Sequence, residues 1–298
     1  MSPLRYTLLC LAALIGCSDG GSIDTTDRDA SPGCQTGNLA AGSDRIEIDF
    51  DGMGRSYEIH APPSYDGEDP VMLVLNFHGL ASTGPLHQER SKMNATADAR
   101  GFIVVYPNGY QTSWNGGACC GKAADEGIDD VGFARAMIED IGERACIDPK
   151  RIYATGMSNG GFMSHRLACE AADVIAAAAP VAGLLGLEPG ECNPSRPIPL
   201  LHMHGLEDTL VPYEGVDESI ETWAEKNGCT GTPSGETIGS ATCETRSDCS
   251  DGASVTLCSI ENHGHCWPLQ ETCAWGPVAP DFPGNDVMLD FFESVELP

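Results

Sequence analysis

A serine flanked by glycines is the first residue of this chain that could act as a nucleophile. Ser158 is the centre of the pentapeptide G-M-S-N-G, which separates an apolar run at residues 151–155 from a helical pattern at residues 162–168. A serine on a sharp turn from a strand to a helix needs small residues two positions away on either side, because the turn presses them against the adjacent strand and helix. The pattern predicts such a nucleophile elbow, and a serine that caps a helix is the structural alternative.

Two later apolar runs lead to residues that could complete a catalytic triad. Residues 197–201 are followed by Asp208, and residues 254–260 are followed by His265. The order Ser, Asp, His along the chain is that of α/β-hydrolases and differs from the orders in chymotrypsin and subtilisin. We expect His265 to take the proton of the Ser158 hydroxyl, and Asp208 to orient the imidazole and stabilise its charged form.

Acyl transfer at a serine also needs backbone N–H groups that stabilise the oxyanion formed from the carbonyl oxygen. One donor is the residue after the nucleophile, here Asn159, and the other comes from the loop after an early strand. Residues 71–77 are an apolar run that predicts this strand, and a His-Gly turn follows it. We therefore expect the second donor to be the backbone N–H of Leu80.

Other residues in these segments could take the same roles or bind a metal. Glu207 and Asp217 are alternative acids, and His263 is an alternative base. The two His-x-His pairs, at residues 202–204 and 263–265, would each place two imidazoles on one face of an extended segment, where they could bind zinc. No zinc-hydrolase motif accompanies them. We therefore expect no metal and no cofactor.

Five blocks of sequence carry a family resemblance. They are N-F-H-G at 76–79, S-W-N-G-G-A-C-C-G at 113–121 with D-D-V-G-F at 129–133, residues 156–170, residues 202–215, and G-H-C-W-P at 264–268. In this order the blocks resemble the polyhydroxybutyrate depolymerase family of secreted esterases, which also contains feruloyl and acetylxylan esterases. The resemblance extends from about Arg45 to the C-terminus. It implies an α/β-hydrolase fold, a triad of Ser158, Asp208 and His265, and ester hydrolysis through an acyl-enzyme.

The resemblance also implies residues of the substrate pocket. The family's base directly precedes an x-Trp-Pro segment, which favours His265 over His263 and places Trp267 beside the ester. Trp114 is a second candidate, and loop packing is the structural alternative for both tryptophans. One branch of feruloyl esterases links cysteines beside the serine and the histidine. Met157 precedes the serine here, so that link cannot form and the feruloyl interpretation is weakened.

These observations predict an exported serine carboxylic ester hydrolase. Hydroxyalkanoate oligomers of the poly(3-hydroxybutyrate) type are the first substrate class, and feruloyl or acetylxylan esters of plant cell-wall polysaccharide are the alternative. A non-catalytic surface binding protein on a hydrolase scaffold is a hypothesis of another class, which the complete set of triad residues disfavours. A peptidase on the same fold is a third.

The N-terminal segment predicts export. Residues 3–16 form a short apolar run with one early positive charge, which is typical of a signal peptide. The sequence Leu-Ile-Gly-Cys that ends at Cys17 resembles a bacterial lipobox and would make Cys17 a lipidated first residue, with full secretion as the alternative. We expect a signal peptide with lipobox at 1–17, a flexible linker at 18–42 and a catalytic domain at 43–298. The protein would then be extracytoplasmic, either lipid-anchored at the cell envelope or secreted.

Alternating strand and helix patterns predict one α/β domain with a largely parallel sheet covered on both faces. An opening hairpin is expected from residues 45–48 and 56–59, which flank an Asp-Gly turn. Further strands are expected at 71–77, 102–106, 152–155, 198–201 and 255–260, and helices at 131–145, 162–172 and 219–226. A closing helix at 286–297 would be capped by Asn285.

Cysteine usage indicates an oxidising compartment. The chain has 14 cysteines, and the twelve outside the predicted signal segment allow six disulfides. Adjacent Cys119 and Cys120 would form a strained ring with each other, so we expect each to have a separate partner. The family resemblance suggests two further pairs: Cys229 with Cys249, and Cys266 with Cys273 or with one of the adjacent cysteines. A zinc site is the rival explanation, and it lacks paired C-x-x-C spacings.

The balance of charges excludes some partners. The chain has 16 Lys and Arg against 44 Asp and Glu, a formal net charge of -28. Phosphate groups would be repelled, so we expect no nucleic acid and no anionic membrane surface as partner. The predicted partner is an ester substrate, with membrane contact only through an N-terminal lipid anchor. The sequence makes no prediction of oligomeric state.

Overall fold

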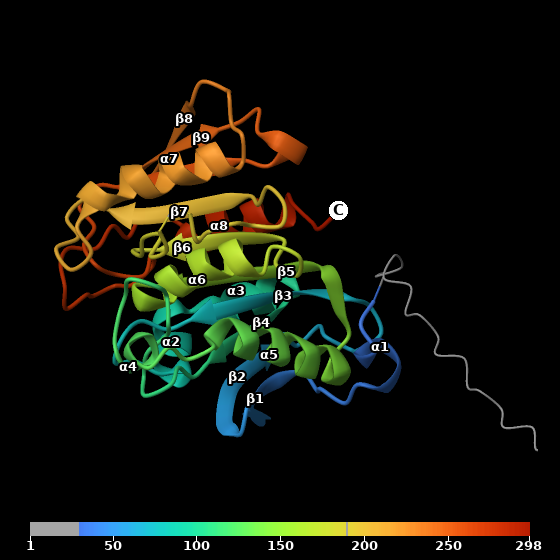
Figure 1. Ribbon diagram of the computed structural model, residues 1–298. Coiled ribbons are helices and arrows are strands. Elements are labelled where there is room, and N and C mark those ends of the chain that lie inside the picture. Colours follow the sequence, from blue (N-terminus) through green and yellow to red (C-terminus); the bar gives the residue numbers. More distant parts are fainter. Residues whose placement is uncertain (1–29, 189) are drawn as a thin grey trace, which may run out of the picture.

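The structure is a computed structural model that describes residues 30–188 and 190–298 (Figure 1). The predicted signal peptide, the lipobox cysteine Cys17 and most of the predicted linker lie outside these residues. The last part of that linker packs on the domain: Ser31 is buried and its hydroxyl donates to the Ala145 carbonyl at 2.7 Å, and Cys34 is disulfide-bonded to Cys146. The folded domain therefore already includes residues from Ser31 on, and the predicted linker boundary at residue 42 is wrong.

In the described part of the chain, ten strands form one mixed sheet in the order β1-β2-β4-β3-β5-β6-β7-β10-β9-β8. The inner strands, from β4 to β10, pair in parallel, and antiparallel pairing adds two strands at each edge. The strands are β1 (Gly42–Phe50), β2 (Met53–Ala61), β3 (Val71–Phe77), β4 (Ile103–Pro107), β5 (Ile147–Met157), β6 (Ala177–Val181), β7 (Leu200–Gly205), β8 (Ser234–Ile238), β9 (Ala241–Arg246) and β10 (Val255–Ile260).

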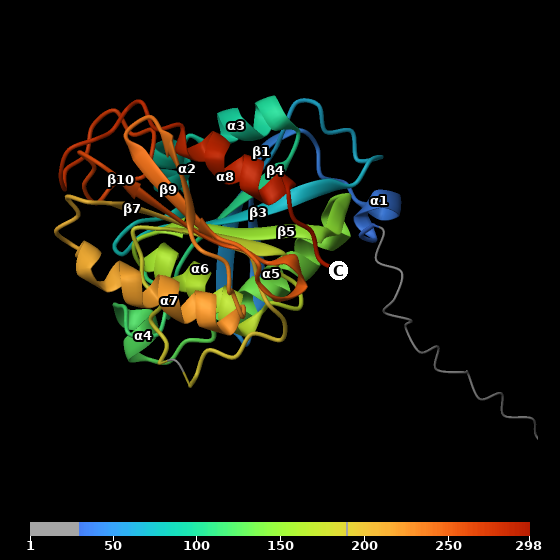
Figure 2. The same ribbon diagram turned by 90° about the horizontal axis from the view of Figure 1, so that it is seen from above.

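Helices cover both faces of this sheet (Figure 2). One face carries α5 (Asp130–Arg144), α6 (Asn159–Glu170) and α7 (Val216–Lys226), and the other carries α2 (Gly84–Ser91), α3 (Met93–Arg100) and α8 (Gly284–Glu293). The short elements are α1 (Gly33–Thr36), α4 (Lys122–Asp125), η1 (Tyr213–Gly215) and η2 (Ser250–Gly252). No helix of the described residues is long and apolar enough to cross a bilayer. The predicted single-domain α/β-hydrolase architecture is confirmed.

The two-residue period of the strands produces a separate core on each face of the sheet. Along β3, Leu73 and Leu75 pack in one core and Met72 and Val74 in the other. Both sets are buried, because a parallel sheet with helices on both faces has no solvated side. This explains why the central strands are continuous apolar runs in the sequence.

The sequence pattern does not predict every strand. The segment A-A-A-P-V of β6 is rich in alanine, which has low strand propensity, yet β6 lies between β5 and β7 in the middle of the sheet. The edge strand β8 is mostly exposed and polar, so it lacks an apolar signal. Long-range pairing, which no local pattern encodes, decides both strands.

The closing helix begins earlier than predicted, and Asn285 does not cap it. Pro283 occupies the N-cap position of α8, and Asn285 is a buried residue within the helix. Its amide group donates to the Ser91 carbonyl at 3.0 Å and accepts the indole N–H of Trp267 at 2.9 Å. Asn285 therefore joins α8 to the end of α2 and to the loop that carries Trp267.

Twelve cysteines of the described residues form six disulfides. The pairs are Cys34–Cys146, Cys119–Cys120, Cys169–Cys192, Cys229–Cys249, Cys243–Cys258 and Cys266–Cys273. The expected pairs Cys229–Cys249 and Cys266–Cys273 are present. The expectation of separate partners for Cys119 and Cys120 is wrong: the two sulfurs are bonded to each other, and the Cα atoms lie 3.2 Å apart.

Candidate active site

The backbone at Ser158 has the geometry of a nucleophile elbow. Ser158 joins β5 to α6 with φ 56° and ψ -123°, a conformation that a residue with a side chain adopts only where its surroundings enforce it. A Cβ atom on Gly160 would lie 2.1 Å from the Phe77 carbonyl oxygen, so only glycine fits there. The hydroxyl makes no capping hydrogen bond to α6. The structural alternative, a helix-capping serine, is therefore not what the structure shows.

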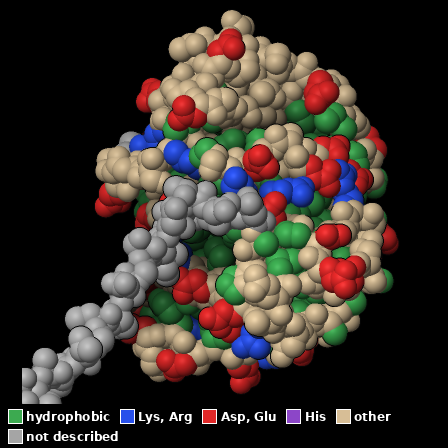
Figure 3. Space-filling model, turned by 90° about the vertical axis from the view of Figure 1, so that its right-hand side faces the viewer, with side chains coloured by type: hydrophobic (Ala, Val, Ile, Leu, Met, Phe, Trp, Pro, Cys, Tyr) green, Lys and Arg blue, Asp and Glu red, His purple; other side chains and the backbone are tan. Residues whose placement is uncertain are grey.

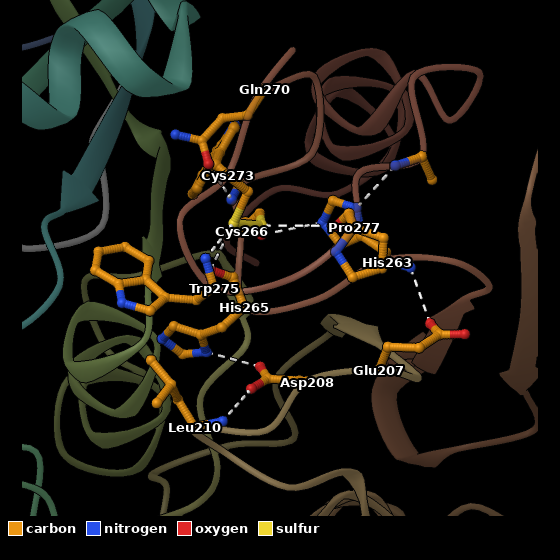
Figure 4. Close-up of a disulfide and its surroundings, with 12 residues drawn as sticks. Glu207, Asp208, Leu210, His263, His265, Cys266, Gln270, Cys273, Trp275 and Pro277 are labelled. Carbon is orange, nitrogen blue, oxygen red and sulfur yellow. Dashed lines mark hydrogen bonds and ion pairs between the residues drawn. A yellow bond between two sulfur atoms is a disulfide. The ribbon is translucent and has the colours of Figure 1, made fainter.

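His265 and Asp208 form a hydrogen-bonded pair (Figure 4). The Nδ1 of His265 lies 2.7 Å from Oδ2 of Asp208, and the side chains point toward each other from the loops after β10 and β7. Burial disfavours the charged carboxylate, but hydrogen bonds from His204 and His265 outweigh it and hold the pKa of Asp208 well below its usual range. An ionised Asp208 needs a proton on Nδ1 of His265. This leaves Nε2 unprotonated and able to accept a proton.

The carboxylate of Asp208 is also held by backbone groups. Its Oδ1 accepts the N–H groups of Leu210 and Val211, both at 2.9 Å. Asp208, the first residue of the turn at 208–211, is therefore held in place by the backbone of that same turn. The alternative acids are not placed in this way: the Glu207 carboxylate accepts the backbone N–H of His263, and Asp217 lies on α7.

The alternative base, His263, is occupied by other contacts. Its Nε2 faces the Cys266 carbonyl at 3.2 Å, and its Nδ1 accepts the N–H of Ala279 at 3.2 Å. The other His-x-His pair also hydrogen-bonds within the protein, since Nε2 of His202 lies 3.0 Å from Nδ1 of His204. Across residues 30–188 and 190–298, no group of three or more His, Cys, Asp or Glu side chains is arranged to hold a metal ion.

Two backbone N–H groups beside Ser158 have no hydrogen-bond partner among the described residues. They belong to Leu80 and Asn159, the two predicted oxyanion donors. The loop that contains Leu80 lies against the elbow, because a Cβ atom on Gly79 would be 3.9 Å from the Ser158 hydroxyl oxygen. Free N–H groups beside a nucleophile can stabilise a developing oxyanion.

A cavity of about 610 Å³ opens over Ser158 and His265. This volume lies in the usual range for small-molecule sites. Most of its wall is apolar, and the residues that line it are Gly79, Leu80, Ser82, His87, Arg90, Ala118, Cys119, Cys120, Met157, Ser158, Phe162, Leu184, Leu210, Val211, Pro212, His265 and Trp275. The disulfide between the adjacent cysteines is thus part of the cavity wall.

Neither of the tryptophans predicted for the substrate pocket lines this cavity. Trp267 is fully buried, with its indole N–H on Asn285 and its ring edge-to-face with His87. Trp114 is also fully buried. Its backbone N–H donates to the side-chain oxygen of Asn159 at 2.7 Å, and its carbonyl accepts from the side-chain nitrogen of Asn159 at 2.9 Å. Its indole N–H donates to the His78 carbonyl at 2.9 Å. The pocket prediction is therefore wrong for both, and Trp114 supports the two segments that carry the free N–H groups.

Trp275 takes the place in the cavity that sequence reasoning assigned to Trp267. Its side chain is 45% exposed and its ring lies edge-on to His265, with 6.3 Å between ring centroids (Figure 4). The Cys266–Cys273 disulfide closes the loop between these two residues, and the backbone N–H of His265 donates to the Trp275 carbonyl at 3.1 Å. The available sequence signal was an aromatic residue just after a cysteine that could close the histidine loop.

The fold is that of an α/β-hydrolase, and the His265–Asp208 pair shares a cavity with Ser158. The chain belongs to the family described as Esterase PHB depolymerase, whose model matches residues 55–191. It is 37% identical over 233 residues to Feruloyl esterase B of Piromyces equi, covering 71% of this chain and 42% of that protein. It is 30% identical to the Putative esterase NocK of Nocardia uniformis subsp. tsuyamanensis, covering 74% of this chain and 73% of that protein.

Solved structures share the fold. An acetyl xylan esterase from Aspergillus awamori superposes with a TM-score of 0.64 at 16% identity, over 84% of this chain and 99% of that chain. The chain spans less than half the length of the feruloyl esterase above.

Proposed function

We propose that this protein is a serine esterase that hydrolyses feruloyl or acetyl esters of plant cell-wall polysaccharide. The observation that carries the proposal is the hydrogen-bonded pair of His265 and Asp208, which shares one cavity with Ser158 on its elbow. The names of the relatives support cell-wall acyl esters better than hydroxyalkanoate oligomers, which the sequence patterns placed first. Met157 excludes the disulfide that one branch of feruloyl esterases forms beside the serine, so the proposal concerns esterases outside that branch.

The proposed reaction proceeds through an acyl-enzyme. The Ser158 oxygen attacks the ester carbonyl carbon while Nε2 of His265 accepts the hydroxyl proton. The N–H groups of Leu80 and Asn159 stabilise the negative oxygen of the tetrahedral intermediate. The C–O bond to the alcohol then breaks, and His265 gives its proton to the leaving oxygen. A water molecule then attacks the carbonyl carbon of the acyl-enzyme while His265 accepts its proton. The bond to the Ser158 oxygen breaks, His265 returns the proton to that oxygen, and the acid is released.

The mouth of the cavity supports an aromatic acyl group over acetate. Leu80, Leu210 and Trp275 line the cavity and are among the few large apolar side chains that are exposed in the described residues, together with Leu206. Flat aromatic groups bury more apolar area against such a rim than a methyl group does, and can pack edge-on or offset against the indole.

The test compares purified mature wild type with Ser158→Ala on p-nitrophenyl acetate and butyrate, methyl ferulate, acetylated xylan, hydroxybutyrate oligomers and a chromogenic peptide anilide. Serine-dependent release of ferulate or acetate is the expected result, with residual turnover only in the variant. Preferred release of hydroxybutyrate would replace the substrate class, and cleavage of the anilide would indicate a peptidase. If wild type cleaves no ester, the surface binding protein becomes the better hypothesis.

The proposed location is outside the cytoplasm, anchored through Cys17. Six disulfides within the described residues support an oxidising compartment. A lipidated Cys17 should make the N-terminal peptide heavier by a diacylglyceryl group and keep the protein in the membrane fraction. Cys17→Ser should abolish both. Wild type found in the medium with an unmodified N-terminus would instead show ordinary secretion.

A further inference from the structure

Three buried histidines form a continuous hydrogen-bonded chain behind Asp208. Nε2 of His165 lies 3.2 Å from Nδ1 of His202, and Nε2 of His202 lies 3.0 Å from Nδ1 of His204. All three side chains are at most 1% exposed. His202 and His204 share one face of β7 because they are two residues apart on a strand, and that face meets α6, which carries His165.

A tryptophan sets the direction of this chain. The indole N–H of Trp223 in α7 lies 2.9 Å from Nδ1 of His165, and an indole N–H can only donate. Nδ1 of His165 must therefore accept, which places the hydrogen of a neutral His165 on Nε2. The same logic applies at each step, so His202 and His204 also carry their hydrogen on Nε2. Every N–H in the chain then points toward the turn that holds Asp208.

The last N–H of the chain reaches the acid. Nε2 of His204 lies 2.8 Å from the Val211 carbonyl and 3.4 Å from Oδ2 of Asp208. The shorter distance makes the carbonyl the main acceptor. The backbone N–H of Val211 in turn donates to Oδ1 of Asp208. His204 thus fixes both ends of the turn that presents the carboxylate to His265.

Burial keeps the first two histidines of the chain, His165 and His202, uncharged. Desolvation lowers the pKa of His165 to about 3, against a smaller upward effect of a hydrogen bond to the Gly183 backbone. Desolvation, with the neighbouring His204 and His165, also lowers the pKa of His202 well below its usual value. A neutral imidazole has one donor and one acceptor, so the direction set at Trp223 is transmitted without a net charge.

We propose that Trp223, His165, His202 and His204 are positioning residues that orient Asp208 through fixed histidine tautomers. The proposal rests on the proposed function, because Asp208 is taken as the acid of the triad. If the indole N–H is removed, the direction of the chain is no longer set, and His204 can present an unprotonated Nε2 to the carbonyl and the carboxylate. That arrangement is repulsive and would move the turn away from His265.

The first measurement is the tautomeric state of the three histidines by nitrogen and carbon NMR of the isotopically labelled wild-type protein near neutral pH. The expected result is hydrogen on Nε2 in all three. Hydrogen on Nδ1 of His202 or His204 would overturn the proposal. This readout needs neither a variant nor any enzymatic activity, so it stands apart from the test of the esterase function.

The second measurement is the kinetics of Trp223→Phe, which keeps an aromatic ring and removes one N–H. We expect kcat to fall by about tenfold or more with little change in KM, since a misplaced acid impairs chemistry and not binding. Tyr153→Phe is the matched control, because it also removes one hydrogen bond, from the Tyr153 hydroxyl to the Val295 carbonyl at 2.6 Å, and Tyr153 packs in the core on the other face of the sheet from Trp223. Equal loss in both variants, or no loss in Trp223→Phe, would contradict the proposal.

Discussion

Asp208 is the most constrained residue of the candidate triad. It accepts hydrogen bonds from the His265 imidazole and two backbone N–H groups, and Nε2 of His204 lies 3.4 Å from its Oδ2, while the Ser158 hydroxyl has no cap contact to α6. A carboxylate surrounded by donors stays ionised and cannot turn away from its histidine. The base is therefore kept in the tautomer that can accept the serine proton.

Replacing this carboxylate by an amide tests its role. We expect Asp208→Asn to lower kcat by about 10⁴-fold, because the amide favours the wrong tautomer of His265. The exposed acid on α7 is the control, and Asp217→Asn should retain wild-type kcat. A loss of less than about tenfold in Asp208→Asn would remove Asp208 from the mechanism.

A second prediction at this scale concerns Trp275. We expect Trp275→Ala to raise KM for methyl ferulate by about tenfold, which corresponds to about 1.4 kcal/mol of lost aromatic and apolar contact. KM for p-nitrophenyl acetate should change less than threefold, because acetate has no ring to contact the indole. Equal changes for both esters would mean that Trp275 does not select the acyl group.

Among the elements, the loop between β4 and α5 depends on a buried ion pair. Arg55 on β2 lies 2.7 Å from the Asp130 carboxylate at the start of α5, and both side chains are almost fully buried. The other oxygen of Asp130 accepts the backbone N–H of Asn115 at 2.8 Å. The guanidinium also lies over the Phe133 ring at 3.9 Å. This pair anchors the loop that includes Trp114 and the adjacent cysteines of the cavity wall.

Removing one partner of this pair should destabilise the fold. We expect Asp130→Ala to lower the free energy of unfolding by about 3–5 kcal/mol, because it leaves the Arg55 charge buried and uncompensated. Its neighbour Asp129 only caps α5, by accepting the N–H of Gly132 at 2.8 Å, so Asp129→Ala should cost about 1 kcal/mol. Urea unfolding with intact disulfides measures both. A cost no larger for Asp130→Ala than for Asp129→Ala would argue against the ion pair as an anchor.

For the molecule as a whole, buried neutral histidines make stability depend on pH. Desolvation is the main cause that lowers the pKa of His87 and His165 to about 3 and that of His78 to about 4, and it holds the pKa of His202 well below its usual value. In the unfolded chain these groups titrate near pH 6.5. The unfolded state therefore binds more protons as the pH falls below about 6.5, and stability decreases.

We expect the free energy of unfolding to fall between about pH 6.5 and about pH 4, by up to about 1.4 kcal/mol per pH unit for each of these histidines. Asp208 has a lowered pKa too, but its contribution is lost only below about pH 4, so it does not obscure this window. Urea unfolding at several pH values measures how steeply the free energy of unfolding depends on pH. His87→Gln should make this dependence less steep, by up to about 1.4 kcal/mol per pH unit. Constant stability from about pH 7 to about pH 5 would refute the prediction.

The acidic surface belongs to the same scale. On the face in Figure 3, Asp and Glu side chains are dispersed over the surface with Lys and Arg among them. The ion pairs of the described residues include nine between an arginine and a carboxylate, one that involves a lysine and three that involve a histidine. The net charge of -28 nevertheless remains mostly unpaired, so added salt should stabilise the folded protein by screening repulsion.

How far the sequence determined the fold can be judged from individual elements. The opening hairpin, the strands β3, β4, β5, β7 and β10, and the helices α5, α6 and α7 follow from apolar periodicity and turn residues. The strand β6 does not, because its alanines have no strand preference of their own. The adjacent cysteines were assigned separate partners because a disulfide between neighbouring residues was expected to form a strained ring.

The sequence likewise predicted only part of the candidate site. The order of Ser158, Asp208 and His265 could be taken from the sequence, because each follows a strand and the carboxyl ends of parallel strands meet at one edge of the sheet. The pocket residues could not, since whether Trp267 or Trp275 faces the cavity depends on how the disulfide-closed loop packs against α8. The histidine chain was visible only as a His-x-His pair. Its direction and its link to Asp208 come from α6 and α7, which tertiary packing alone brings to β7.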